Sequence, residues 1–173
     1  MRFECDVDVD FNGIVMFVYP KLADLFEGGV QPGQNVLRAF TTTDKGDEVL
    51  DKGVALPIMG VDDGTYRLRI FIDEAPCKER REVVFEDEYF YLNVVGGLYV
   101  ADMAVLWDWE EFTGWTLLPV PTGMYRVSVA GVHLYNEVND VDYGFDICLQ
   151  TVSEPFHRTI EPRSDSRLIK IIR

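Results

Sequence analysis

Long hydrophobic runs and basic residues are scarce in this sequence, and each scarcity excludes a class of protein. No apolar run approaches the roughly 20 residues that a membrane-spanning helix needs. The N-terminus alternates acidic and apolar residues, whereas a signal peptide has a basic start and an apolar run. Acidic residues number 30 against 16 basic ones, for a net charge of −14. We therefore expect no binding to nucleic acid through phosphates and no docking on an anionic membrane.

Cysteine occurs only at Cys5, Cys77 and Cys148, and the spacing matches no CxxC metal or redox motif. An odd number of cysteines without a signal peptide indicates free thiols in the reducing cytoplasm. An immunoglobulin-type disulfide between Cys77 and Cys148 is rejected, because Cys77 lies in a polar run where a core strand is required.

Motifs for catalysis and for cofactors are also missing. None of the serines lies in a Gly-x-Ser-x-Gly motif, and neither a P-loop nor a dinucleotide-binding glycine pattern occurs. The two histidines, His133 and His157, have no cysteine at metal-ligand spacing. We expect no metal site and no cofactor, and we name no catalytic residue; enzymatic activity stays open but has no support in the sequence.

The residues that are present favour β-strands, as short runs rich in Val, Ile, Tyr and Phe separated by Gly, Pro, Asn and Asp. Hydrophobic residues make up 47% of the chain, enough for the core of one domain over residues 1–173. Acidic and apolar residues alternate before Asn12-Gly13, and an apolar run follows. This pattern predicts a β-hairpin of residues 3–11 and 14–19.

Further strands and other segments are expected along the rest of the chain. The strands are predicted near residues 35–43, 54–59, 65–73, 82–86, 89–95, 98–106, 115–119, 124–134 and 143–152. Residues 44–53 are predicted to form a loop, and residues 101–112 are the segment with the best helical pattern.

One pattern, Gly-x-Tyr-Arg-apolar-x-apolar, occurs twice, beginning at Gly64 and at Gly123. It predicts a pseudo-repeat of a β-hairpin unit over about 54–95 and 116–152, with Tyr66 and Tyr125 facing inward at equivalent positions. Two such units that cover each other's apolar faces predict an all-β fold, an antiparallel β-sandwich or a partly closed barrel. Residues 156–173 are read as a basic C-terminal tail.

The most unusual segment is residues 107–115, which contains all three tryptophans and three carboxylates; we call it the tryptophan segment. Three interpretations stay open: rings at the core edge with acids facing water, a protein-binding hot spot, and a carbohydrate-binding module or carboxylate-based glycoside-acting enzyme. The candidate binding residues are Trp107, Asp108, Trp109, Glu110, Glu111 and Trp115, together with Asp140 and Asp142 from a later acidic loop.

Charge is distributed unevenly along the chain. Between Glu82 and Phe156 the sequence contains 13 acidic residues, and Arg126 is the one basic residue. Such a stretch favours solubility, and it also favours fast association with a basic protein partner.

The C-terminal block begins with Leu118-Pro119 and continues through Gly123-x-Tyr125-Arg126-Val127, an acidic loop and the strand from Tyr143 to Val152. It resembles the end of the competence-J, or DNA-entry nuclease inhibitor, family and related bacterial immunity-type β-sandwich proteins. The resemblance covers residues 118–152 and implies a small acidic inhibitor of a basic nuclease. No inhibitory residue can be assigned from it. The expected function is that of a non-enzymatic cytoplasmic binding protein.

Overall fold

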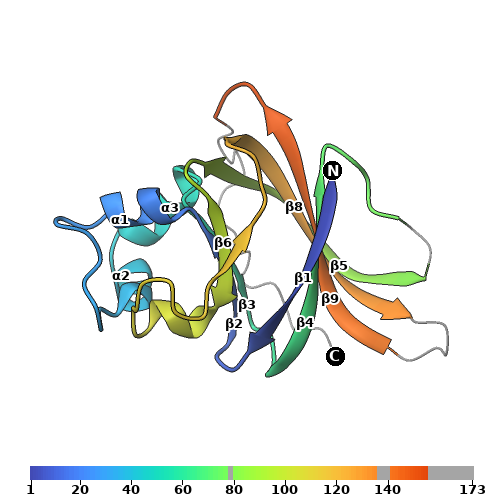
Figure 1. The fold of residues 1–173 in the computed structure, drawn as a ribbon, viewed down its shortest axis with the longest axis horizontal. Coiled ribbons are helices and arrows are strands. Elements are labelled where there is room, and N and C mark those ends of the chain that lie inside the picture. The colour runs from blue at the N-terminus through green and yellow to red at the C-terminus, as the bar shows by residue number, and fades with distance from the viewer. Residues whose placement is uncertain (78–79, 136–140, 156–173) are drawn as a thin grey trace.

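The computed structural model describes residues 1–77, 80–135 and 141–155, and it contains two β-sheets with helices on the outer side of one of them (Figure 1). The five-stranded sheet has the order β1 (Arg2–Val9), β4 (Gly64–Ile72), β9 (Val141–Val152), β8 (Gly123–Tyr135) and β5 (Arg81–Val94). The four-stranded sheet has the order β3 (Ala55–Met59), β2 (Gly13–Phe17), β6 (Leu98–Asp102) and β7 (Thr116–Leu118). The predicted all-β, sandwich-like fold is confirmed.

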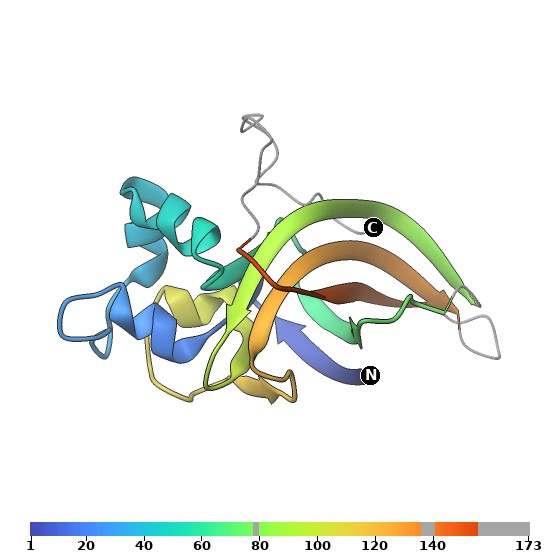
Figure 2. The ribbon, with the colours of Figure 1, turned by 90° about the horizontal axis from the view of Figure 1, so that it is seen from above.

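The five-stranded sheet is curled into a half-barrel. Its β5–β8 pair is long, and register shifts in β5 fall between Val83 and Phe85 and between Asp87 and Phe90. Such irregularities bend a strand and increase its twist, and Figure 2 shows β5 and β8 arching over β9. Among the described strands, β4 and β9 form the one parallel pair, and every other pair is antiparallel.

Alternating residues of the five-stranded sheet face the four-stranded sheet. In β1, Val7 and Val9 are buried while Asp6 and Asp8 are exposed, as the alternation in the sequence predicts. We call the cluster between the sheets the inter-sheet core; its fully buried members include Ile14, Met16, Leu56, Ile58, Leu68, Ile70, Val127, Phe145 and Ile147.

The strand β2 is buried on both faces, which explains why its sequence is continuously apolar and does not alternate. Ile14 and Met16 face the inter-sheet core, whereas Val15 and Phe17 face the helices. We call this second cluster the helix-side core; its members are Val15, Phe17, Leu22, Phe26, Val30, Val36, Val49, Val54, Ala55, Ala101, Met103, Leu106 and Trp109.

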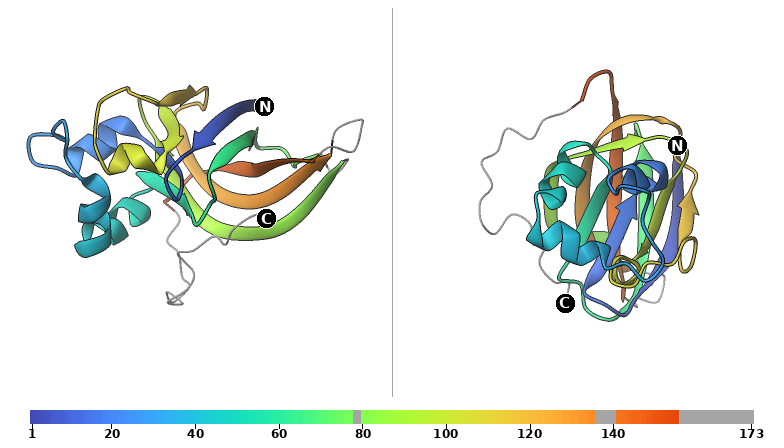
Figure 3. Two further views of the ribbon diagram at one scale, coloured as in Figure 1. Left: turned by 90° about the horizontal axis from the view of Figure 1, so that it is seen from below. Right: turned by 90° about the vertical axis from the view of Figure 1, so that its left-hand side faces the viewer.

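Three short helices cover the helix-side core: α1 (Tyr19–Asp24), α2 (Val36–Thr42) and α3 (Lys45–Asp51) (Figure 3). The prediction of a strand at 35–43 is wrong, because Val36 and Phe40 are four residues apart and pack on the same side of a helix. Asn35 caps that helix, since its side-chain oxygen accepts a hydrogen bond from the Arg38 backbone N–H at 2.7 Å. The loop predicted at 44–53 is also wrong, because it contains α3.

The helix predicted at 101–112 reduces to one 3₁₀ turn, η1 (Met103–Leu106), directly after β6. The Asp102 side chain caps this turn and accepts a hydrogen bond from the Ala104 backbone N–H at 2.6 Å. The same carboxylate accepts backbone N–H groups of Asp10 and Phe11, the latter at 3.1 Å. Asp102 therefore ties the β1–β2 connection to the start of η1.

The predicted hairpin of 3–11 and 14–19 is wrong, because β1 pairs with β4 whereas β2 pairs with β3 and β6. Asn12-Gly13 carries the chain from one sheet to the other. Asn12 has the positive φ expected of this dipeptide, 57°, and a Cβ on Gly13 would lie 2.1 Å from the Ile58 carbonyl oxygen. A strand with two apolar faces has to occupy an interior position, and β2 finds it beside β3 and β6.

The two Gly-x-Tyr-Arg segments begin β4 and β8, and each follows a turn from the four-stranded sheet. Tyr66 and Tyr125 are both buried in the inter-sheet core. Each hydroxyl donates to the carbonyl four residues earlier, Tyr66 to Asp62 at 3.0 Å and Tyr125 to Pro121 at 2.9 Å. The repeat of a hairpin is wrong, however: β8 pairs with β9, but β4 and β5 lie at different places in the sheet.

Candidate functional site

The tryptophan segment connects η1 to β7 and lies on the helix side of the four-stranded sheet, where it appears yellow in Figure 1. Backbone hydrogen bonds hold it against the loop before α2. The Gly33 N–H donates to the Trp109 carbonyl at 2.8 Å, and the Trp109 N–H donates to the Gln34 carbonyl at 3.3 Å. The segment is thus fixed at its centre, and its ends differ in exposure.

The three tryptophans have different environments. Trp109 is fully buried in the helix-side core, with ring centroids 4.9 Å from Trp115 and 6.0 Å from Phe17. Trp115 is half-buried, and Trp107 is 56% exposed. The prediction that Trp109 is a binding residue at the surface is therefore wrong, because its indole is part of the helix-side core.

The indole N–H groups of Trp109 and Trp115 are buried and lack an acceptor among the described residues. A buried donor without a partner costs about 1–3 kcal/mol. The packing of the aromatic rings outweighs that cost, since burying a tryptophan removes a large apolar area from water.

The acids of the segment also divide. Glu111 accepts a hydrogen bond from the Tyr19 hydroxyl, with 2.6 Å between the oxygen atoms. That hydrogen bond is the main cause that raises the pKa of Tyr19 to about 12, and burial and the Glu111 charge add to it. Asp108 and Glu110 are exposed and have no hydrogen-bond or ion-pair partner among the described residues. Two of the three carboxylates therefore face solvent freely.

The remaining predicted acids do not join the segment. Asp142 lies at the start of β9 in the other sheet and forms an ion pair with Arg67 at 3.7 Å. Asp140 lies outside the described residues. The structure thus gathers Trp107, Asp108, Trp109, Glu110, Glu111 and Trp115 but separates Asp142 from them.

Two exposed phenylalanines, Phe11 and Phe112, lie beside the tryptophans of the segment and were not among the candidate residues. Phe11, in the β1–β2 connection, packs edge-on against Trp107 with 5.6 Å between ring centroids. Phe112 is 57% exposed, with a positive φ of 61°, and its ring lies 5.0 Å from Trp115. The contact between Phe11 and Trp107 joins residues far apart in sequence, which no local pattern reveals.

Asp146 is the one buried charged residue in the described part of the chain, and it is 1% exposed. The Arg69 guanidinium donates to both carboxylate oxygens, at 2.6 and 2.8 Å, and Arg81 donates to the second of them. The acidic stretch is therefore less open than its sequence indicates. Asp146 is neutralised by arginines outside it, and Glu88 pairs with Arg126 at 3.7 Å.

Cys148 lies beside Asp146 on β9 and lines two shallow pockets of about 440 and 240 Å³. Burial is the main cause that raises the pKa of its thiol. A raised pKa lowers the thiolate fraction, so the site lacks an activated nucleophile at this cysteine.

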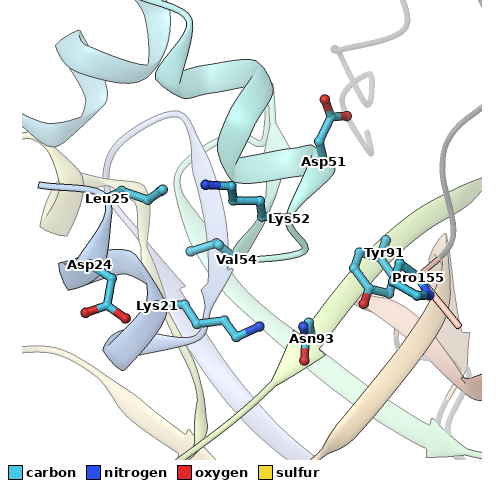
Figure 4. A pocket seen from close by; sticks show the side chains of 9 residues that line it. All are labelled: Lys21, Asp24, Leu25, Asp51, Lys52, Val54, Tyr91, Asn93 and Pro155. Atoms are coloured by element: carbon cyan, nitrogen blue, oxygen red, sulfur yellow. The ribbon is translucent and has the colours of Figure 1, made fainter. Parts of the chain in front are cut away.

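A third pocket, of about 450 Å³, lies between α1, the end of α3 and β5 (Figure 4). Its walls combine apolar and polar side chains, which are Lys21, Asp24, Leu25, Asp51, Lys52, Val54, Tyr91, Asn93 and Pro155. The Tyr91 hydroxyl is buried without a hydrogen-bond partner among the described residues, and burial raises its pKa. No residue of the tryptophan segment lines this pocket.

The described residues contain no group of three or more His, Cys, Asp or Glu side chains placed to hold a metal ion. Within the same residues, no helix has both the length and the apolar character needed to cross a bilayer.

Few known proteins are similar to this chain in the comparisons. No protein-family model matches it, and no curated protein matches it. The chain is similar to a solved structure named "Crocagin biosynthetic gene J", with 15% identity and a TM-score of 0.48. The match covers 86% of this chain and 96% of that chain.

Proposed function

We propose that this protein is a non-catalytic binding protein that docks a basic protein partner through the tryptophan segment and Phe11. One observation carries the proposal: Trp107 is 56% exposed and packs against Phe11, which is itself exposed. Contiguous exposed apolar surface, rimmed by polar residues, marks sites of protein interaction. Tryptophan also dominates the energetic hot spots of protein interfaces.

Carboxylates around this pair supply the charge that favours a basic partner. Three exposed carboxylates lie next to these aromatic residues in the sequence. Asp10 precedes Phe11, Asp108 follows Trp107, and Glu110 follows the buried Trp109. A lysine or arginine of the partner gains attraction from these carboxylates and from the indole face. The net charge of −14 adds long-range steering that speeds encounter with a basic surface.

The carbohydrate-binding alternative has weaker support. Stacking on a sugar requires indole faces open along a groove, but Trp109 is buried and Trp115 is half-buried. One exposed tryptophan with one phenylalanine suits the anchor of a protein interface better.

A nuclease inhibitor is the narrower form of the proposal. It rests on the resemblance of residues 118–152 to the competence-J family and on the basic character that a nuclease needs to grip phosphates. We also propose a reducing, cytoplasmic setting, in keeping with the unpaired cysteines Cys5, Cys77 and Cys148.

The test is capture of partners by the immobilised chain, identification of those that are basic, and binding kinetics at two salt concentrations. We expect Trp107→Ala to speed dissociation about tenfold, because it removes the desolvated anchor. Glu110→Lys should slow association and flatten its salt dependence. Each nuclease captured is assayed for inhibition.

The matched control is Val84→Ser on β5, where Val84 is an exposed apolar residue in the other sheet. It should leave both rate constants unchanged. The proposal fails if no basic partner is captured, or if Trp107→Ala and Val84→Ser bind alike.

A further inference from the structure

The pocket of Figure 4 brings together three polar side-chain groups that have no hydrogen-bond partner among the described residues. They are the Lys21 amine on α1, the Asn93 amide on β5 and the Tyr91 hydroxyl, two residues before Asn93. The Tyr91 side chain is buried, and its ring packs so closely on the chain that a Cβ at Gly53 would meet it at 2.5 Å. Buried polar groups in native proteins are nearly always satisfied, so an unsatisfied one beside a pocket points to a ligand.

The pocket is lined by two lysines and two aspartates, so the directions of these side chains decide which charge its interior favours. Lys21 and Lys52 are two of only five lysines in the chain. Lys52 forms an ion pair with Glu48, whereas Lys21 has no carboxylate within ion-pair distance among the described residues. Burial lowers the pKa of Lys21. Figure 4 shows the Lys21 amine directed toward Asn93, while the carboxylates of Asp24 and Asp51 point away from the centre.

Apolar groups complete the walls. Leu25 and Val54 face the space between the two lysines, and the Tyr91 ring and Pro155 form the opposite side (Figure 4). The volume of about 450 Å³ falls within the range of roughly 300–1,000 Å³ that is usual for small-molecule sites. The pocket therefore offers a cation and a neutral donor at one end and an apolar surface around them.

We propose that this pocket binds a small organic carboxylate, with its charged end at Lys21 and Asn93 and its apolar chain against Leu25 and Val54. The carboxylate accepts hydrogen bonds from the Lys21 ammonium, the Asn93 amide and the Tyr91 hydroxyl, which would otherwise lack a partner. Its chain removes apolar pocket surface from water. The site is separate from the proposed docking surface, because the two share no residue.

Isothermal titration calorimetry with sodium hexanoate tests the proposal, with hexan-1-ol and hexylamine as probes of equal chain length. We expect saturable binding of hexanoate, binding of hexanol that is weaker by about tenfold, and no binding of hexylamine. Hexylamine binding as tightly as hexanoate would overturn the proposal, since Asp24 and Asp51 would then define a cation site. The absence of saturable hexanoate binding would overturn it as well.

Lys21→Met keeps the aliphatic stem and removes the charge. It should weaken hexanoate binding about tenfold, whereas the matched variant Lys52→Met should stay within about twofold of the wild type, because Lys52 is already paired. Equal losses in both variants would refute the assignment to Lys21.

A measurement on the unmodified protein keeps the test independent of folding defects. The pKa of the Lys21 side chain, followed by carbon-detected NMR, should rise when hexanoate saturates the pocket, because a nearby anion stabilises the ammonium. An unchanged Lys21 pKa at saturating hexanoate would place the ligand elsewhere and refute the proposal.

Discussion

The two hydrophobic cores of this protein are built on different principles, although β2 contributes to both. The inter-sheet core takes every second residue of long strands, so its members can be recognised by a period of two. The helix-side core combines one face of β2 with three short helices and the centre of the tryptophan segment. None of these pieces has a long period of its own. The comparison teaches that a regular core is visible in sequence, whereas a core assembled from short pieces is not.

Replacing one fully buried side chain in each core tests whether they unfold as one unit. Trp109→Ala in the helix-side core should lower the free energy of unfolding by about 3–5 kcal/mol, and Leu68→Ala in the inter-sheet core by about 2–5 kcal/mol. Urea unfolding is followed by far-UV circular dichroism and by tryptophan fluorescence. Coincident transitions in both variants indicate one cooperative unit, and separated transitions show that the cores are independent.

Gly13 is the first residue of β2, the strand that contributes to both cores. Its substitution should therefore destabilise both cores. Gly13→Ala should cost about 1–3 kcal/mol from strained backbone, with a further loss because the new Cβ meets the Ile58 carbonyl. Gly28→Ala is the matched control, since Gly28 also has a positive φ but has nothing within 4 Å of the added Cβ. Equal losses of stability in the two variants would mean that the close approach of β2 to β3 is unimportant.

Tyr66 and Tyr125 allow two equivalent positions within the inter-sheet core to be compared. Tyr66→Phe and Tyr125→Phe each remove a hydrogen bond to the carbonyl four residues earlier. We expect each to lower the free energy of unfolding by about 1 kcal/mol. Thermal unfolding of both variants is the measurement, and costs that differ by more than about 1 kcal/mol would show that the segments are not energetically equivalent.

Trp107 should give the smallest effect on stability, although it lies two residues from Trp109. Trp107→Ala removes an exposed ring, so the free energy of unfolding should change by no more than about 0.5 kcal/mol. The same urea experiment measures it beside Trp109→Ala. A loss above about 2 kcal/mol would show that Trp107 belongs to the helix-side core, which would also weaken the proposed docking surface.

The sequence predicted correctly those features that depend on residues nearby in the chain, such as the burial of alternating side chains. Val7 and Val9 alternate with aspartates, and the two tyrosines follow matching turns, so their burial could be read directly. The partners of a strand depend on the whole chain instead. Asn12-Gly13 has the local chemistry of a hairpin, yet β1 and β2 separate because both faces of β2 must be buried.

The candidate site shows the same division between local and distant causes. Composition drew attention to the tryptophan segment, but it could not assign Trp109 to the core and Trp107 to the surface, because the segment is irregular. Burial of Asp146 depends on Arg69, a residue 77 positions away. The pocket beside α1 depends on the end of α3, which the sequence predicted as part of a loop at 44–53.

Because β9 follows β4 by about 70 residues, their parallel pairing can form only late in synthesis by the ribosome. β1 can pair with β4 once residue 72 has emerged, but the other edge of β4 stays open until residues 144–149 arrive. An open strand edge invites pairing with other chains. For about half of its translation the nascent protein therefore has an edge of β4 that lacks its partner strand and can pair with other chains.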